Sequence, residues 1–495
     1  MLADIEQTRL AVTNRIDRKK RAMLGQFFTP IKISRFMAGL FEQNGTEHCR
    51  LLDAGAGVGS LIDAFLERCF RGDFNYESMQ VDAFEIDHSL RPYLEGTINK
   101  YKNGLNFVAD IRYADFIHVA SDWLSESLFG TPPPLFTHAI LNPPYKKIRS
   151  NSEHRLALRR AGIETVNLYS AFVALALSLL EEKGQLVAII PRSFCNGPYY
   201  GPFREHILRR SAIKHIHLFG SRSKAFKDDD VLQENIIIKL ECGVKQGDVR
   251  VSTSTDDSFD DLSLHNYPFD QIVLPDDPGH FIHVPTSPET AGAAPSSFIH
   301  YSLSEIGISV STGPVVDFRL KEHLRDMPEP GTVPLLYPGH FKDNGIEWPK
   351  KGLKKPNAIR HNTDTERWLY PNGAYCIVRR FSSKEERRRV VARAVDATAF
   401  PNAPLLGFEN HLNLFHENKR GLPRSLAYGL AVYLNSTSVD ESFRRFNGHT
   451  QVNATDLKLI KYPSRDALMA LGTWALKQGE LSQEIIDHKM GSLLV

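Results

Sequence analysis

The sequence predicts an α/β fold, a Rossmann-like, doubly wound and mostly parallel sheet, followed by a C-terminal domain of mixed α+β character. Three observations carry this prediction. Short apolar segments with strand character alternate with helical segments through about residue 240. The first strand runs into a glycine loop and the second ends in acidic residues. Near residue 246 the composition changes, which separates a second region from the first.

The composition is typical of a globular protein of two or three domains. Of 495 residues, 42% are hydrophobic and 24% charged, and the net charge is only +2. The five cysteines form no Cys-x-x-Cys pair and have no histidine at zinc spacing, so we expect reduced thiols and no metal site. We find neither a signal peptide nor a run of 18 apolar residues, and therefore expect a cytoplasmic protein without a membrane anchor.

Two helices are expected before the first strand. Residues 1–22 indicate a polar helix that ends in the basic cluster 18–21, which is more often a solvated face than a phosphate contact. Thr29 would cap the second helix and Pro30 would occupy its first position. The free amides at this helix start could hold a small carboxylate.

A glycine loop follows the first strand, within residues 50–60. The second strand, residues 81–87, carries Glu85, which lies 26 residues after Gly59, where a carboxylate can bind ribose hydroxyls. The loop is Gly-Ala-Gly-Val-Gly and not Gly-x-Gly-x-x-Gly, and no Gly-Lys-Ser/Thr follows it. A cofactor with ribose and adenine but no phosphate fits this loop better, and S-adenosyl-L-methionine is such a molecule.

A third acidic position follows residues 106–110, the next expected strand. Asp115 could accept a hydrogen bond from the adenine amino group of the cofactor, and Phe116 could pack on its ring. An ordinary acidic loop residue explains Asp115 equally well.

Residues 137–145 combine a buried strand with the rigid loop Asn142-Pro143-Pro144-Tyr145. A planar amino group could donate one proton to the Asn142 side-chain oxygen and the other to the Pro143 carbonyl, while its ring stacks on Tyr145. This set of acceptors favours methyl transfer to an exocyclic nitrogen. A Pro-Pro turn that only ends a strand would have the same sequence.

The rest of the first region continues the alternation. An apolar helix is expected from Asn167 to Leu180, with Gly184 as its C-terminal cap. A buried strand at 186–190 and two further strands, 213–219 and 234–240, follow. Phe226 lies in the basic loop between the last two strands.

The second region is divided into a junction at 246–300, a domain at 301–465 and a tail at 466–495. Residues 342–393 contain fourteen Lys and Arg against six Asp and Glu, which favours a surface that faces DNA phosphates. A solvated helix would explain residues 384–393 as well. The candidate phosphate contacts are Lys350, Lys351, Lys354, Lys355, Arg379 and Arg380.

The order of these motifs resembles the gamma class of DNA adenine-N6 methyltransferases, the TaqI-like and Eco57I-like modification methylases of type II restriction-modification systems. Specific motifs carry the resemblance through the first half, and residues 306–313 and 448–457 carry it loosely in the second. It implies a class I methyltransferase fold, with residues 1–245 as the catalytic domain and 301–465 as the target-recognition domain.

The resemblance implies four groups of residues around S-adenosyl-L-methionine. Phe28, Thr29 and Pro30 would lie at its methionine end, and Asp53, Gly55, Gly57 and Asn142 would line the pocket wall. Glu85 would lie at the ribose, and Ile86, Asp115 and Phe116 at the adenine. Within this set Glu85 would bind the ribose hydroxyls. Ile86 and Phe116 would enclose the adenine, and Asp115 would accept from its amino group.

The resemblance also implies that the tetrad Asn142, Pro143, Pro144 and Tyr145 holds an adenine flipped out of double-stranded DNA, with Phe226 as the candidate for a second stacking ring. Two acceptors on the amine would localise its lone pair toward the methyl group. No strong general base would be needed, because alignment and electrostatics supply most of the catalysis.

Other functions share this chemistry. Similar tetrads occur in enzymes that methylate glutamine in release factors and in RNA amino methyltransferases, but those proteins are shorter and lack a basic second domain. A non-catalytic DNA-specificity subunit would need neither the glycine loop nor the tetrad. Since no nuclease motif is found, we expect methylation without cleavage by a monomer or dimer, with any cognate restriction endonuclease acting as a separate protein.

Overall fold

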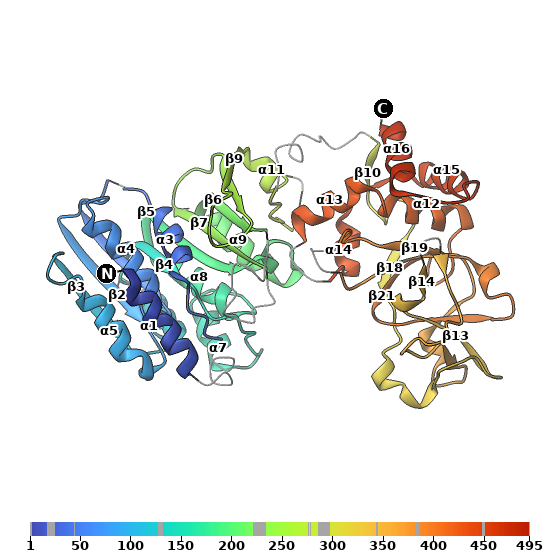
Figure 1. Cartoon of the computed structure of the whole chain (residues 1–495), viewed down its shortest axis with the longest axis horizontal. Coiled ribbons are helices and arrows are strands. Elements are labelled where there is room, and N and C mark those ends of the chain that lie inside the picture. The colour runs from blue at the N-terminus through green and yellow to red at the C-terminus, as the bar shows by residue number, and fades with distance from the viewer. Residues whose placement is uncertain are drawn as a thin grey trace. The chain divides into compact units, whose positions relative to one another are not determined.

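The chain forms two compact units, Met1–Ala291 and Gly292–Val495, in a computed structural model (Figure 1). The structure describes residues 2–16, 25–43, 45–126, 132–220, 234–275, 277, 279–285, 298–342, 345–382, 386–447 and 451–494. Within these ranges, no helix is both long and apolar enough to traverse a lipid bilayer.

The first unit is built on a nine-stranded sheet with the order β3-β2-β1-β4-β5-β7-β6-β8-β9. The strands are β1 His48–Ala54, β2 Ser78–Phe84, β3 Phe107–Arg112, β4 Phe136–Leu141, β5 Leu180–Pro191, β6 Ser211–Phe219, β7 Asn235–Cys242, β8 Val249–Ser254 and β9 Ser263–Tyr267. Neighbouring strands from β3 to β5 pair in parallel, and β7 is antiparallel to both its neighbours. The strand order reverses between β1 and β4, which confirms the expected doubly wound α/β fold.

Helices pack against two separate cores of this sheet. The helices of the first unit are α1 Leu2–Arg15, α3 Ile31–Gly39, α4 Ser60–Phe70, α5 Arg91–Asn99, α6 Phe116–Glu126, α7 Glu153–Arg160, α8 Leu168–Ser178, α9 Gly201–Arg210 and α11 Phe269–Ile272. Leu51 and Ile140 belong to the core shared with α3, α4 and α5. Leu52 and Leu141 belong to the core shared with α6 to α9, because successive strand residues point to opposite faces.

The expected end of the apolar helix is wrong. Helix α8 ends at Ser178, and Gly184 lies inside β5, which begins at Leu180 where it pairs with Phe136. The register of β5 against β4 shifts just after this pair. A Cβ atom on Gly184 would lie 2.9 Å from the carbonyl oxygen of Glu181, so the glycine serves a strand irregularity and not a helix cap.

The boundaries of the second region also differ from expectation. Residues 249–267, placed in a junction, form β8 and β9 of the first unit, and the observed division falls after Ala291. The C-terminal segment 466–475, placed in a tail, lies in α15 (Arg465–Ala475), which packs closely on α12 (Arg424–Leu434). Cβ atoms on Gly429 and Gly472 would meet the opposing backbone at 1.8 and 1.6 Å, so these two helices touch through their glycines.

The second unit has mixed α+β character, as predicted. Its main sheets have the orders β11-β21-β18-β19 and β12-β16-β13-β20-β17, and β10-β22 and β14-β15 form two-stranded pairs. The strands are β10 Ile299–Tyr301, β11 Ser309–Thr312, β12 Leu324–Arg325, β13 Thr332–Leu336, β14 Phe341–Lys342, β15 Gly345–Ile346, β16 Ala358–Arg360, β17 Leu369–Pro371, β18 Tyr375–Arg379, β19 Ala392–Val395, β20 Leu405–Phe408, β21 Leu412–His416 and β22 Tyr462–Pro463. The remaining helices are α13 Thr437–Phe446, α14 Ala454–Leu459 and α16 Gln483–Leu494.

Candidate functional site

A cavity lies in the first unit where the chain leaves β1, β2, β3 and β4, close to the point at which the strand order reverses. It is lined by Gly25, Gln26, Phe27, Phe28, Gly55, Gly57, Phe84, Glu85, Ile86, Ala114, Asp115, Phe116, Ile117, Asn142, Pro144, Lys146, His154, Leu168 and Phe172. Doubly wound sheets bind their ligands at this position. The cavity therefore gathers segments that are far apart in the sequence.

Most of the candidate cofactor residues line this cavity. They are Phe28, Gly55, Gly57, Glu85, Ile86, Asp115, Phe116 and Asn142. Thr29, Pro30 and Asp53 do not line it. Of the candidate target residues, Asn142 and Pro144 line it, Pro143 and Tyr145 do not, and Phe226 lies outside the described residues.

The glycine loop has a backbone shape that side chains rarely allow. Gly55 has φ 90° and Gly57 has φ 57°, both in the left-handed region. A Cβ atom on Gly57 would lie 3.0 Å from the ring of Phe28. Glycine at this position thus permits both the turn and the close approach of Phe28, which forms the opposite wall.

Glu85 is held rigidly at the end of β2. Its carboxylate accepts hydrogen bonds from the backbone amides of Gly57 at 2.8 Å and Asp87 at 2.7 Å. Burial raises the pKa of Glu85, and the two amides oppose that rise by stabilising the charged form. Gln26 approaches the same carboxylate at 3.4 Å. The acid is therefore fixed in position by the glycine loop that it faces.

Asp53 lies in β1, beneath the cavity and not in its wall. Its side chain is fully buried, and neither carboxylate oxygen has a hydrogen-bond donor among the described residues. Burial, and then the nearby charge of Glu85, raise the pKa of Asp53 well above its usual range. In this structure Asp53 is therefore not placed to contact a ligand in the cavity directly.

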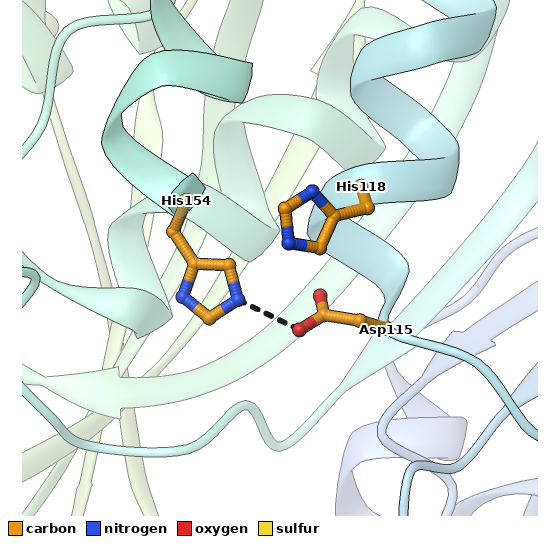
Figure 2. Close-up of side chains that lie close together, drawn as sticks. All are labelled: Asp115, His118 and His154. Carbon is orange, nitrogen blue, oxygen red and sulfur yellow. Dashed lines mark hydrogen bonds and ion pairs between the residues drawn. The ribbon is translucent and has the colours of Figure 1, made fainter. Parts of the chain in front are cut away.

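Asp115 is fixed by two donors, as Figure 2 shows for one of them. The backbone amide of Ile117 donates to one carboxylate oxygen at 2.9 Å, and Nε2 of His154 donates to the other at 2.7 Å. Burial opposes the charge on Asp115, but the hydrogen bond and charge of His154 lower its pKa below the usual value. The same hydrogen bond raises the pKa of His154. Both shifts favour the charged form of the residue concerned.

His118 completes a cluster with this pair. Its ring centroid lies 5.1 Å from that of His154, and the ligand atoms of Asp115, His118 and His154 all lie within 4.8 Å of one another (Figure 2). Two imidazoles and a carboxylate are a donor set that transition metals accept. The spacing of these three residues in the sequence does not predict such a cluster.

The side-chain amide of Asn142 is locked in one orientation. Its Nδ2 donates to the carbonyl oxygen of Phe27 at 2.8 Å and to Oγ1 of Thr29 at 2.9 Å. The Tyr145 hydroxyl lies 3.1 Å from both Oδ1 of Asn142 and the carbonyl oxygen of Ile189. Because both amide protons are engaged, the oxygen is the atom left to accept from a ligand, and an amide oxygen has two lone pairs.

Thr29 is not the cap of helix α3. The helix begins at Ile31, Pro30 occupies the cap position, and no side chain of these residues caps it. Instead, Glu6 of α1 accepts from the Ile31 amide at 3.1 Å. The Thr29 hydroxyl is therefore available to hold Asn142, a role that depends on tertiary contact and has no local sequence signal.

The sequence reasoning also missed several residues of the cavity. Phe27 immediately precedes Phe28, but only its contacts reveal that its carbonyl oxygen accepts from Asn142 and that its ring lies 5.7 Å from that of Tyr145. Gly25, with φ 68°, packs against Pro144, where a Cβ atom would approach to 3.2 Å. No motif in the sequence indicates that His154 lines the cavity.

Several cations of the basic segment, residues 342–393, already have partners within the second unit. Lys355 pairs with Asp317 at 2.6 Å, and Arg379 pairs with Glu386. Lys350 donates to the carbonyl oxygen of Gly339 at 2.8 Å, and Arg380 donates to the Asn410 carbonyl and to Gln451. In contrast, Lys351 and Lys354 are exposed, and no partner for either is seen in the described part of this unit.

Comparison with known proteins agrees with this geometry. Residues 84–226 match the family model described as Eco57I restriction-modification methylase. The chain is 53% identical to the type II methyltransferase M.BsuBI of Bacillus subtilis, covering 100% of this chain and 98% of that protein. It is 42% identical to M.PstI of Providencia stuartii, covering 98% and 95%.

A solved structure titled as a DrdV–DNA complex shares the fold. It has a TM-score of 0.53 at 12% identity, and the match covers 97% of this chain and 60% of that one. At this identity the likeness concerns the fold alone.

The cofactor of the family is S-adenosyl-L-methionine, and the cavity suits it. Carboxylates end two neighbouring strands, Phe116 offers an aromatic face, and the glycine loop leaves no room for a side chain at Gly57. The match over the full length of two relatives then decides the family. The chain belongs to the Eco57I-like type II methyltransferases of restriction-modification systems.

Proposed function

We propose that this chain methylates N6 of an adenine in double-stranded DNA and so protects that site from a cognate restriction endonuclease, a separate protein. The observation that supports this most directly is the locked amide of Asn142, a residue that lines the cavity together with most of the candidate cofactor residues. A planar exocyclic amine is the group that such an acceptor suits.

The cofactor contacts follow from the cavity. Glu85, fixed by two backbone amides, would bind the ribose hydroxyls. Asp115, ionised and fixed by two donors, would accept from the cofactor's adenine amino group, with Phe116 and Ile86 on its ring. Gly55 and Gly57 would let the backbone approach the ligand. With these contacts, the methyl donor would lie between the glycine loop and the tetrad.

The target amine would be held by two acceptors. The Asn142 oxygen would accept one of its protons, and the backbone carbonyl of Pro143 would accept the other. The two prolines of the tetrad stiffen the loop, so the acceptors need little reorganisation when the amine arrives. Their effect is to localise the nitrogen lone pair, which is otherwise conjugated with the ring.

When bound, the cofactor supplies an electrophilic methyl group on a sulfonium sulfur. The nitrogen–carbon bond forms as the sulfur–carbon bond breaks, and the amine becomes cationic and acidic. Its extra proton then passes to solvent, so the chain need not provide a strong base. The work of Asn142 and Pro143 is to orient the amine and to stabilise positive charge on its hydrogens.

The base would reach the cavity by leaving the duplex, because the amine is inaccessible within it. Tyr145 would stack on the flipped base, and its hydroxyl, held between Asn142 and Ile189, fixes the ring for that purpose. Phe226 remains the proposed second ring. In the second unit, Lys351 and Lys354 would contact DNA phosphates, together with Lys350, Lys355, Arg379 and Arg380 where their present partners permit.

The test is methylation of a mixed-sequence plasmid with labelled cofactor, followed by mass spectrometry of the nucleosides. We expect N6-methyladenine, and a site that becomes resistant to one restriction enzyme. N4-methylcytosine would overturn the choice of base, because cytosine also carries an exocyclic amine. Label in a release factor or in RNA, with none in DNA, would overturn the substrate class.

A further inference from the structure

We propose that His154 is a positioning residue for cofactor binding: it holds the Asp115 carboxylate in the orientation that accepts the adenine amino group of S-adenosyl-L-methionine. This inference rests on the proposed function, because it requires Asp115 to contact the cofactor. It assigns a role to a side chain that none of the sequence motifs contains.

His154 and Asp115 come from different elements and meet at the cavity. Asp115 lies between β3 and α6, and His154 lies in the first turn of α7, yet both line the cavity. Figure 2 shows the His154 ring directed at the carboxylate, with 2.7 Å between Nε2 and Oδ2. The Ile117 amide holds Oδ1 at 2.9 Å. Each oxygen therefore has one fixed donor and retains a lone pair for a ligand.

Without His154, the Asp115 carboxylate would lose one of its two fixed donors. The Ile117 amide alone holds one oxygen, so the carboxylate could rotate about that contact. Asp115 is partly buried, and burial disfavours its charged form. The charged groups that influence His154 are Asp115, Glu153 and Lys146, and His118 also acts on Asp115. Among these, His154 is the side chain that makes the hydrogen bond.

The segment from Tyr145 to His154 connects the two ends of the site. His154 lies nine residues after Tyr145, at the end of a segment that backbone hydrogen bonds pin to the start of α8, from Ile148 to Val166 and from Leu168 to Lys146. Ser152 accepts from the Arg155 amide and so caps α7. The segment that leaves the target tetrad thus carries the residue that orients the cofactor's acceptor.

A metal ion bound by Asp115, His118 and His154 is the alternative use of this cluster. Ligands of a tetrahedral zinc ion lie about 3.3 Å apart, given bonds of about 2.0 Å. The 2.7 Å between His154 and Asp115 is instead a hydrogen-bond distance. The geometry therefore favours a shared proton over a shared metal, and metal binding becomes an outcome of the test.

The experiment measures the dissociation constant of S-adenosylhomocysteine by calorimetry, without DNA and without turnover. We expect His154→Ala to weaken binding about tenfold, the cost of one charge-assisted hydrogen bond. His154→Gln, which keeps a donor, should stay within about threefold of the wild type. His118→Ala is the matched control and should bind as the wild type does. Thermal unfolding confirms that each variant is folded.

A second ligand isolates the mechanism. With an analogue that has hydrogen in place of the adenine amino group, His154→Ala and the wild type should bind equally, because Asp115 then has nothing to accept. An equal tenfold loss with both ligands would overturn the proposal and indicate a general packing role. Wild-type affinity of His154→Ala for S-adenosylhomocysteine would overturn it as well.

Asp115→Asn separates this inference from the proposed function. If Asp115→Asn weakens binding and His154→Ala does not, only the positioning role fails. If Asp115→Asn binds like the wild type, the assignment of Asp115 to the adenine fails first. Saturable zinc binding that displaces the ligand and disappears in His118→Ala would replace the positioning role by a metal site.

Discussion

The cavity of the first unit and the basic segment of the second unit both contain the residue types that the sequence predicts for a binding site. They differ in how the polar side chains are paired with their neighbours. In the cavity, polar groups such as Asn142, Glu85 and Asp115 have several fixed partners and still face open space. In the basic segment, a cation that has a fixed partner is occupied by that partner and is not left free for a ligand. Lys355, which pairs with Asp317, is an example. In the cavity, a hydrogen-bond partner therefore orients a polar group for a ligand. In the basic segment, an ion-pair partner competes with the ligand.

The difference lies in which atoms the partners use. Asn142 donates both amide protons to the protein and presents its oxygen, so the internal contacts leave the useful atom available. A lysine has only donors, and an ion pair with a carboxylate cancels the charge that a phosphate would bind. Mutation of a residue with fixed partners should therefore have a large effect on activity in the cavity. In the basic segment, the same kind of mutation should affect stability and not DNA binding.

The largest effect is expected at the locked amide. Asn142→Ala should lower the rate of methylation about 100- to 1,000-fold, because it removes an acceptor that is aligned before the reaction. Binding of S-adenosylhomocysteine should change little. Single-turnover methylation and calorimetry measure the two quantities. Turnover near that of the wild type would contradict the proposed role, and Thr29→Val, which frees one amide proton, should give a smaller loss.

The second prediction examines a buried cation of the basic segment. Arg389 is 1% exposed, and its guanidinium donates to Asn447 at 2.9 Å and Ser382 at 3.2 Å. Arg389→Met leaves these acceptors unsatisfied and should lower the free energy of unfolding of the second unit by about 2 kcal/mol. Urea unfolding measures this loss. DNA affinity of the folded variant should not change; a large loss of affinity would show that buried and exposed cations act alike.

The third prediction concerns the loop that faces Phe28. Gly57→Ala places a methyl group 3.0 Å from the Phe28 ring at a φ of 57°, so we expect a loss of about 1–2 kcal/mol in stability and weaker cofactor binding. Gly72→Ala is a matched control, because Gly72 has φ 80° with no atom within 4 Å of the added carbon. Similar strain without a change in cofactor affinity is expected there. Equal affinity in both variants would argue against a cofactor beside Gly57.

The smallest effect is expected at the two exposed lysines. Lys351→Ala combined with Lys354→Ala should reduce the slope of log affinity against log salt concentration by about 1.8, close to 0.9 for each lost phosphate contact. Fluorescence anisotropy with duplex DNA measures the slope. Lys355→Ala removes a cation that is already paired, and its slope should change less. A larger change for Lys355→Ala than for the pair would reverse the comparison.

Local sequence predicted the parts of this molecule whose conformation depends on neighbouring residues. The glycine loop needs left-handed backbone at Gly55 and Gly57, and the apolar strand that precedes the two prolines ends at Leu141, just before Asn142. Alternation of strands and helices was sufficient for the doubly wound sheet, since parallel strands need crossover helices.

Packing decides what remained unpredicted. The hydrogen bond between His154 and Asp115 joins residues 39 positions apart, and the bond between Asn142 and Thr29 joins residues 113 apart. No periodicity describes such pairs. Gly184 fitted a helix cap by its local pattern, but strand pairing with β4 extended β5 through it. Charge density likewise says nothing about which lysine has a carboxylate beside it.

The hold that Phe27 and Thr29 exert on Asn142 has a consequence for how the protein can be shortened. Every strand of the large sheet begins after residue 47, so a chain starting at Ile31 would retain all nine strands. It would nevertheless lose Phe27 and Thr29, which accept the two amide protons of Asn142, and of the contacts described above only that with the Tyr145 hydroxyl would remain. We expect this shortened chain to bind DNA through its second unit but not to methylate it. The groups that orient the Asn142 amide lie outside the sheet that carries the tetrad.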